Sequence, residues 1–220
     1  MNVRSLLKYW FRHDTTHHGE FNLMWRVAGH GGPRFFVDVG ANDGFYGSNS
    51  FPFVARGWRA LLIEPHPGAF AKLQKLHGDK SNVALCNLAC ADTAGELPLW
   101  IGSDGDEGTL ATLCTDDHPH FQQARTDQSV LVPVERLEAV LARHKTPHDF
   151  NILSIDTEGM DYEVLLGLDL NVWRPRLIVT EDYAPKDAQK FQYLRQHGYR
   201  PSGQIRANAF WTLAGSAEGA

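Results

Sequence analysis

The stretch FFVDVGANDGFYGSNS, from Phe35 to Ser50, decides the fold. It starts as an apolar run, which is typical of a buried strand. It continues through Gly40, Gly44 and small polar residues, the composition of a tight turn. Open parallel sheets bind ligands at the carboxyl ends of their strands. The stretch therefore predicts a ligand site directly after a strand, and it leaves open a dinucleotide, a phosphate or another ligand.

Apolar segments alternate with segments of helical spacing along the rest of the chain. The segments with strand-like sequence are 34–40, 58–65, 82–90, 149–156, 174–182 and, at the end, 207–214. Those with helical spacing are 50–57, 66–78, 135–144 and 187–199. Two short strand candidates, 96–102 and 129–135, flank an irregular stretch rich in Asp, Gly and Thr. The alternation predicts an α/β fold with a mainly parallel sheet and helices on both faces.

We expect one domain over residues 1–220, with its core at 35–215 and a cap formed by residues 1–34. The apolar residues of a possible helix in the cap fall on one face: Val3, Leu6, Leu7, Trp10 and Phe11. This helix would dock on the domain or cover a cleft, or else its apolar face would touch a membrane surface. The irregular stretch at about 103–128 is expected to be a mobile insertion beside the site.

Composition excludes several classes of protein. The chain has 21 basic and 26 acidic residues, a net charge of −5 with His neutral, which argues against a nucleic-acid partner held by phosphate attraction. No apolar run is long enough to span a membrane. The first residues contain no apolar signal segment, so we expect a cytoplasmic protein. The three cysteines, Cys86, Cys90 and Cys114, lack the spacing of a metal site and are expected to be reduced thiols.

The turn after the first strand does not have the sequence of a phosphate-binding loop. A nicotinamide-binding turn reads G-x-G-x-x-G, but Asn42 occupies its middle glycine position and Asp38 precedes it. A carboxylate so close to the turn suits a diphosphate poorly and suits an amine well. The Gly-Lys-Ser/Thr sequence of a Walker loop is absent as well. The turn thus favours a ligand with a cationic end, although a plain tight turn would also fit the glycines.

A second carboxylate, Glu64, follows the second predicted strand, 24 residues beyond Gly40. In this fold class an acid at that place binds the two hydroxyls of a ribose. Asp38 and Glu64 together describe an adenosine ligand that has a cationic end and no phosphate. S-adenosylmethionine fits that description; the alternative for Glu64 is a solvated carboxylate at a strand end.

Further acids follow the fourth and fifth parallel strands: Asp156 and Glu158, then Glu181 and Asp182. Acids at adjacent strand ends repel one another unless a cation lies between them. Oxygen ligands suit Mg²⁺ or Ca²⁺, and such an ion would lower the pKa of a substrate hydroxyl. The alternative is that these carboxylates cap the following helices or bind the substrate through hydrogen bonds.

Five blocks, taken jointly and in order, resemble the FkbM-type methyltransferases. The resemblance covers Phe35 to Asp182, and its blocks are FFVDVGANDGFYGSNS, GWRALLIEPHPGAFAKL, NLACADTAGELPLW, VPVERLEAVL and ILSIDTEGMDYEVLLGLDL with RPRLIVTED. It implies a class I, Rossmann-like, S-adenosylmethionine-dependent fold with seven strands, of which the last is antiparallel. The family is associated with O-methylation of sugars, lipids or polyketide-derived products.

The resemblance also implies roles for individual residues. The residues it places around the cofactor are Asp38, Gly40, Ala41, Asn42, Gly44, Ser48, Glu64, Pro65, His66, Leu88, Ala89, Cys90, Asp92 and Asp156. Asp156 would lie beside the reactive methyl, and Asp156 and Glu158 would be the catalytic residues. By similarity to catechol O-methyltransferase, the metal ligands would be Asp156, Glu181 and Asp182. The amide of that enzyme is replaced here by Asp182.

The expected reaction is in-line transfer of a methyl group to a hydroxyl of a small-molecule or glycan acceptor. The base would be Asp156 or one of the histidines in the segments near the site: His17, His18, His30, His118 and His120. The acceptor would contact Trp10, Trp25, Tyr46 and Asn49, although both tryptophans would equally suit core packing. A homodimer is possible. The alternatives are a Mg²⁺-dependent enzyme acting on a phenol or catechol, and a catalytically silent scaffold.

Overall fold

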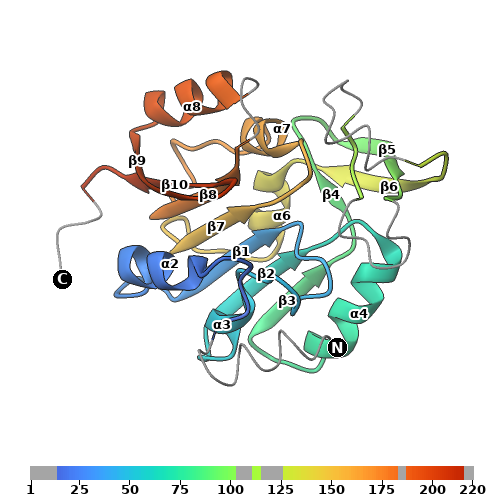
Figure 1. The fold of residues 1–220 in the computed structure, drawn as a ribbon, viewed down its shortest axis with the longest axis horizontal. Helices are drawn as coiled ribbons and strands as arrows, with labels where there is room; N and C mark the ends of the chain where they lie inside the picture. The colour runs from blue at the N-terminus through green and yellow to red at the C-terminus, as the bar shows by residue number, and fades with distance from the viewer. Residues whose placement is uncertain (1–13, 103–110, 115–125, 183–186, 216–220) are drawn as a thin grey trace.

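A computed structural model describes residues 14–102, 111–114, 126–182 and 187–215. Its centre is a seven-stranded sheet in the order β3-β2-β1-β7-β8-β10-β9 (Figure 1). The strands are β1 (Phe35–Val39), β2 (Arg59–Ile63), β3 (Val83–Cys86), β7 (Ile152–Ile155), β8 (Leu177–Glu181), β9 (Tyr199–Ile205) and β10 (Asn208–Leu213). Strands β3, β2, β1, β7 and β8 pair in parallel, and β10 pairs antiparallel with β8 and β9. The expected parallel sheet with an antiparallel last strand is confirmed.

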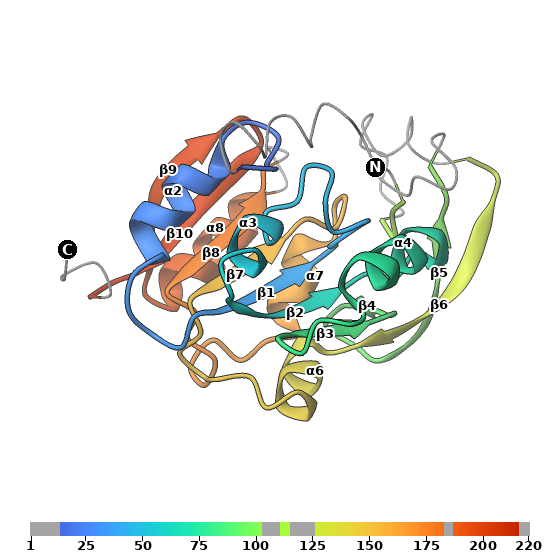
Figure 2. The same ribbon diagram turned by 90° about the horizontal axis from the view of Figure 1, so that it is seen from below.

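Helices cover both faces of this sheet, as Figure 2 shows from below. One core contains side chains of α6 (Leu137–Arg143), α7 (Asp161–Leu166) and α8 (Asp187–Gln196). The other core contains side chains of α2 (Glu20–Ala28), α3 (Phe51–Val54) and α4 (Pro67–His77). Successive residues of a strand point to opposite faces, so Val37 enters the first core and Phe36 the second. The unbroken apolar run at the start of the opening stretch thus follows from burial on both faces.

The predicted strand at 82–90 is two strands in different sheets. After β3 the chain bends at Asn87, whose Nδ2 donates hydrogen bonds to Glu64 O at 2.8 Å and Pro65 O at 3.1 Å. Strand β4 (Ala89–Cys90) then joins β5 (Gly95–Trp100) and β6 (Ser129–Glu135) in a second sheet, at the upper right of Figure 1. The break matters for the site, because it places residues 88–90 beside the end of β2.

Two further elements differ from the expectation. Helix α2 lies in the expected cap and packs Phe21, Met24 and Ala28 on the core, whereas the helix expected from Val3 to Phe11 lies outside the described residues. Strand β9 was not predicted, because most of this edge strand is exposed and has no apolar alternation. Within the described part of the chain, no helix is both long and apolar enough to cross a membrane. None of the three cysteines forms a disulfide bond.

Candidate active site

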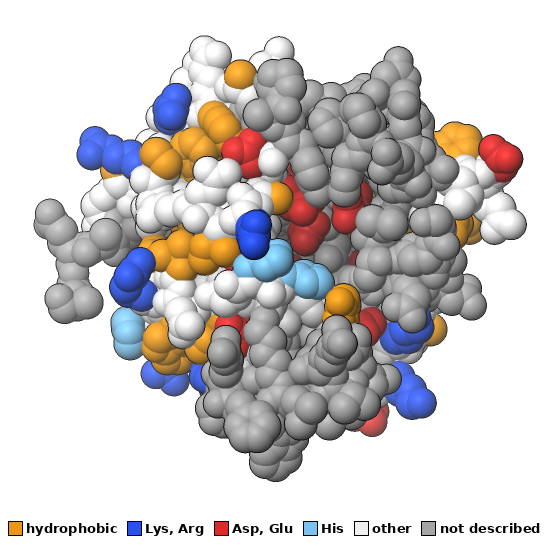
Figure 3. All heavy atoms as spheres, in the orientation of Figure 1, with side chains coloured by type: hydrophobic (Ala, Val, Ile, Leu, Met, Phe, Trp, Pro, Cys, Tyr) orange, Lys and Arg blue, Asp and Glu red, His pale blue; other side chains and the backbone are white. Residues whose placement is uncertain are grey.

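The candidate site is a cavity at the carboxyl ends of β1, β2, β7 and β8, the edge at which the order of the parallel strands reverses between β1 and β7. Acidic side chains gather at the centre of this face, in a hollow bordered by histidine side chains (Figure 3). The predicted cofactor and acid residues in the cavity wall are Asp38, Gly40, Ala41, Asn42, Ser48, Glu64, Pro65, Leu88, Ala89, Cys90, Asp156, Glu158 and Glu181. The wall as described does not include Gly44, His66, Asp92 or Asp182.

The turn after β1 is tightly fitted against the end of β7. Gly40 has φ +88°, and a Cβ at this position would lie 1.8 Å from the backbone oxygen of Asp156. The backbone N–H groups of Gly40 and Ala41 both donate to the oxygen of Ile63, at 2.9 and 3.0 Å. The turn therefore joins the ends of β1, β2 and β7, and only glycine fits its first position.

Asn42, a residue of the cavity wall, carries a buried polar atom without a hydrogen-bond partner among the described residues. Its φ is +48°, and its backbone N–H donates to Glu64 Oε2 at 2.8 Å. Its Oδ1 atom is buried and has no hydrogen-bond partner among the described residues. Since a buried acceptor without a donor costs free energy, this atom fits a ligand that carries a donor. Gly44, in contrast, packs away from the cavity, where a Cβ would lie 2.4 Å from Leu73 Cδ1 of α4.

Glu64 is buried at the end of β2, with 4% of its surface exposed. Its Oε1 accepts the His66 N–H at 2.7 Å, and its Oε2 accepts the Asn42 N–H. A carboxylate offers about four acceptor positions, so further positions remain for ligand hydroxyls. Burial raises the pKa of Glu64 to about 7, and the charges of Asp38 and Asp156 contribute in the same direction. His66 lies behind this group and caps α4, where its Nδ1 accepts the Ala69 N–H at 3.1 Å.

Asp38 lies on the floor of the cavity, within β1. Its carboxylate accepts hydrogen bonds from the side chain and backbone of Ser50 and from the side chain of Ser154, while burial raises its pKa to about 6. Asn49 Nδ2 donates to the same serine, Ser154 Oγ, at 3.2 Å. Sequence reasoning missed Ser154, because a small residue inside a buried strand carries no signal of its own.

Three carboxylates form a cluster beside this floor. Ligand atoms of Asp156, Glu158 and Glu181 all lie within 4.8 Å of one another. Asp156 shares a hydrogen bond with Glu181, and burial together with the nearby Asp161 raises the pKa of Asp156 to about 7. Asp182 is not in this cluster of described residues: its Oδ2 accepts from Gln204 Nε2 at 3.4 Å. Neighbouring residues at a strand end point to opposite sides, so Glu181 and Asp182 separate.

A buried acid beneath this cluster fixes the ends of β7 and β8. Asp161, at the start of α7, accepts the Glu181 N–H at 2.8 Å through Oδ2. Its Oδ1 accepts the Thr157 hydroxyl at 2.7 Å. Lys190 of α8 is buried alongside, and its Nζ donates to the backbone oxygen of Glu181. Sequence reasoning named the segment that contains Asp161 but missed the residue and its partner lysine, which lies far along the chain.

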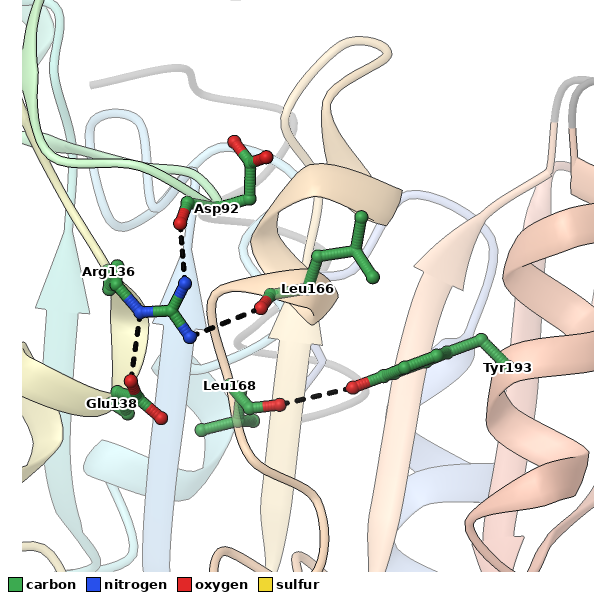
Figure 4. A network of polar contacts seen from close by, with 6 residues as sticks. All are labelled: Asp92, Arg136, Glu138, Leu166, Leu168 and Tyr193. Carbon is green, nitrogen blue, oxygen red and sulfur yellow. Dashed lines mark hydrogen bonds and ion pairs between the residues drawn. The ribbon is translucent and has the colours of Figure 1, made fainter.

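The apolar end of the cavity is lined by Pro65, Leu88, Ala89 and Cys90. Burial raises the pKa of the Cys90 thiol, so this group stays neutral in the cavity wall. Asp92 lies outside the wall, in the network of Figure 4, where its backbone oxygen accepts from Arg136 Nη1 at 2.5 Å. Arg136 also donates to Glu138 Oε1 at 2.8 Å and to the oxygen of Leu166, so it joins the loop after β4 to the start of α6 and the end of α7.

The residues predicted to contact the acceptor or to act as its base differ in where the structure places them. His17, Tyr46 and Asn49 line the cavity, together with Ala111 and Leu113 from the expected insertion. Trp25 belongs to α2 and packs instead on Phe53 of α3 and on Trp58, with ring-centroid distances of 5.9 Å and 6.2 Å. His18 and His30 do not line the cavity as described. Trp10, His118 and His120 lie outside the described residues.

The strand order and the cavity at its switch point define the fold of class I S-adenosylmethionine-dependent methyltransferases, with a mixed α/β core. The family model of the methyltransferase FkbM domain matches residues 38–201, and the chain belongs to this family. Residues 14–34, which include α2 and His17, precede the matched region.

Known proteins resemble the chain over different lengths. Methyltransferase 1 of Beauveria bassiana (strain ARSEF 2860) is 28% identical over 153 residues, which cover 63% of this chain and 60% of that protein. The chain thus spans 60% of the length of this curated relative. A methyltransferase structure from Geobacter sulfurreducens has a TM-score of 0.49 at 12% identity and covers 96% of this chain and 87% of that one. Precorrin-6y C5,15-methyltransferase from Geobacter metallireducens GS-15 has a TM-score of 0.46 at 10% identity, with 86% and 84% covered.

Proposed function

We propose that this chain transfers a methyl group from S-adenosylmethionine to a hydroxyl oxygen. The observation that carries the proposal is a set of three carboxyl groups in one cavity, the buried Asp38 and Glu64 and the half-buried Asp156, whose pKa values are raised to about 6, 7 and 7. Buried acids that repel one another suit a ligand that brings positive charge. A nucleotide phosphate would add like charge to the same place.

The described residues fit this donor. Glu64 has acceptor positions left for the two ribose hydroxyls, and the orphaned Oδ1 of Asn42 offers an acceptor for a donor group of the ligand. Asp38 provides negative charge for the amine end, and Leu88 to Cys90 provide an apolar border for the adenine. The donor supplies an electrophilic methyl group on a sulfonium; the protein orients it and excludes water around it.

The acceptor enters from the exposed side of the same cavity. Tyr46 is 39% exposed, and Asn49, Met160 and Leu113 line the same cavity wall. This mixture of an aromatic face, an amide and aliphatic groups suits a sugar ring or a polyketide-type hydroxyl compound. We propose such a small-molecule or glycan acceptor; the net charge of −5 supports it over a nucleic acid.

A second candidate is metal-assisted transfer to a phenol or catechol. The cluster of Asp156, Glu158 and Glu181 supports it, because three carboxylate oxygens within 4.8 Å of one another match the ligands of Mg²⁺. In this version Glu158 takes the place expected for Asp182. The ion would lower the pKa of the acceptor hydroxyl, and the enzyme would need less help from a protein base.

One experiment tests the proposal and separates the two candidates. Purified protein is incubated with methyl-labelled S-adenosylmethionine and a cell extract, with Mg²⁺ or with a chelator. The label is then separated into glycan, lipid, small-molecule, nucleic-acid and protein fractions. Label in a glycan, lipid or small-molecule fraction is the expected result, and its loss with chelator would favour the metal. Label in nucleic acid or protein alone would contradict the proposed acceptor.

A variant pair makes the result specific to the cavity. Glu64→Gln removes a cavity carboxylate that follows β2, whereas Asp92→Asn changes an acid that follows β4 and lies outside the wall. We expect loss of transfer in the first and normal transfer in the second. Equal transfer by both variants would mean that Glu64 does not hold the donor.

A further inference from the structure

A segment that precedes the matched family region closes one side of the cavity. Thr16 forms an isolated parallel bridge with Gly47, and Thr15 Oγ1 donates to the backbone oxygen of Ser48 at 2.8 Å. Asp14 Oδ1 in turn accepts the Thr16 N–H at 2.9 Å and its hydroxyl at 2.6 Å. The segment 14–18 is therefore fixed directly on the turn that follows β1.

This anchoring sets the position of the His17 ring. A Cβ at residue 47 would lie 2.0 Å from His17 Nε2, so the imidazole lies on the bare backbone of Gly47. The ring of Tyr46 meets it edge-on, with centroids 5.2 Å apart. On the other side of the segment, Glu20 Oε2 accepts the His18 N–H at 2.7 Å. These contacts hold His17 in the cavity wall that also contains Asp156 and Glu158.

The residues of the cavity wall differ in how far they are exposed to solvent. Asp38, Glu64 and Cys90 are buried, with 4%, 4% and 2% of their surfaces exposed. His17 and Tyr46 are exposed at the mouth. With Glu64 at the ribose and Asp38 at the amine end, the proposed donor would occupy the buried side of the cavity, which leaves the mouth to the acceptor. His17 is then a cavity residue on the acceptor's side that can exchange protons with solvent.

We propose that His17 is the general base that takes the proton from the acceptor hydroxyl. This inference rests on the proposed methyl transfer to oxygen. As the bond between acceptor oxygen and methyl carbon forms, the bond between carbon and sulfur breaks and its electron pair returns to the sulfur. The hydroxyl proton moves to a ring nitrogen of His17. The products are a methyl ether, S-adenosylhomocysteine and an imidazolium, which then gives its proton to water.

The groups around the ring are compatible with this role. Tyr46 lies at its edge, the His18 ring is 6.0 Å away, and Asp156, Glu158 and Glu181 share the cavity. Neutral imidazole accepts a proton near neutral pH, and the carboxylates stabilise the imidazolium that forms. Asp156 is the rival base, but it lies deeper and shares a hydrogen bond with Glu181.

His18 supplies a matched control, because it is the adjacent exposed histidine and does not line the cavity. Binding of S-adenosylmethionine is measured by calorimetry for the wild type, His17→Gln and His18→Gln, and label transfer to the cell extract is measured against pH. We expect equal donor binding in all three. We expect transfer to fall by about 100-fold or more in His17→Gln alone, with loss of the rise near the ordinary His pKa of about 6.5.

A second measurement does not need the acceptor. The histidine titrations are followed by NMR in complexes with S-adenosylmethionine and with S-adenosylhomocysteine, with His17 assigned from the His17→Gln variant. The sulfonium charge disfavours a nearby imidazolium, so the pKa of His17 should be lower in the first complex than in the second.

The outcomes separate this inference from the proposed function. Donor binding with an unchanged transfer rate in His17→Gln, or with the same His17 pKa in both complexes, would overturn His17 as the base and leave methyl transfer standing. No donor binding by the wild type would overturn both. An extract without a labelled fraction leaves the NMR comparison to decide.

Discussion

Gly40 is a residue of the site at which a single added carbon atom, a Cβ, would disrupt the backbone packing. Any Cβ would lie 1.8 Å from a backbone oxygen that belongs to β7, and φ is +88°. Gly57 also has a positive φ, +80°, but a Cβ there would meet nothing within 4 Å. Alanine variants at the two positions therefore distinguish the cost of backbone strain, which both share, from the cost of crowding, which only Gly40 has.

We expect Gly57→Ala to lower the free energy of unfolding by roughly 1–2 kcal/mol, the cost of the left-handed conformation. Gly40→Ala should cost this and about 1–3 kcal/mol more from overpacking, and should abolish donor binding. Thermal and denaturant unfolding of both variants measure the difference. Similar losses in the two variants would show that the approach of β1 and β7 relaxes easily.

A substitution of Glu64 tests the proposed contact with the ribose. In Glu64→Gln the charge is lost, and one of the two backbone N–H groups from Asn42 and His66 faces an amide nitrogen. We expect the affinity for S-adenosylmethionine to fall by roughly 1.5–3 kcal/mol, or about 10- to 100-fold in Kd. Calorimetry measures it, with Asp92→Asn as the control; unchanged affinity in Glu64→Gln would remove this residue from the site.

Among the elements, the sequence predicts the parallel strands and the helices α4, α6 and α8, but it does not predict α2 or α7. Their signals are local: an apolar run for β1, and a Pro after a capping His for α4. The split of the third strand into β3 and β4 was missed, because Asn87 bends the chain through bonds to Glu64 and Pro65 that are distant in sequence. The edge strand β9 was missed because its residues face solvent.

In the acid cluster too, contacts between residues distant in sequence could not be predicted. The sequence places Asp156, Glu158, Glu181 and Asp182 after two neighbouring strands, but it does not say which of them converge. The structure brings Glu158 to Asp156 and Glu181, and the bonds of Asp161 to Thr157 and Glu181 fix this arrangement.

Asp161, at the start of α7, accepts hydrogen bonds from Thr157, after β7, and from Glu181, at the end of β8. Its replacement should therefore affect all three elements. In Asp161→Asn, an amide replaces a carboxylate that accepts from Thr157 and Glu181 beside the buried Lys190. We expect a loss of about 1–3 kcal/mol in the free energy of unfolding and a lower methyl-transfer rate. Asp169→Asn, in an exposed loop after α7, should stay within about 0.5 kcal/mol of the wild type. Equal stabilities would mean that Asp161 does not fix the strand ends.

At the scale of the whole molecule, the cavity acids link stability to pH. Asp38, Glu64 and Asp156 have pKa values of about 6, 7 and 7 in the fold, above their ordinary values of about 4. The native state then binds more protons than the unfolded state between about pH 4 and 7. The free energy of unfolding contributed by these groups therefore falls as pH rises through that window.

His77 acts in the opposite direction, since burial lowers its pKa to about 4 and its contribution rises with pH. The change in melting temperature caused by S-adenosylmethionine distinguishes the cavity acids from His77, because this ligand is proposed to bind beside the acids. We expect S-adenosylmethionine to raise the melting temperature more at pH 8 than at pH 5.5, because its positive charge meets ionised carboxylates at the higher pH. A melting-temperature shift that does not change with pH would contradict the pairing of a cationic ligand with these acids.

The acids of the cavity suit an adenosine ligand with a cationic end and no phosphate. Calorimetric titration of the purified chain with S-adenosylmethionine, and separately with NAD and ATP, tests this ligand class. We expect saturable binding of S-adenosylmethionine at pH 8 and no measurable binding of the two phosphate-bearing ligands. Binding of NAD or ATP as tight as that of S-adenosylmethionine, or no binding of S-adenosylmethionine at all, would contradict it.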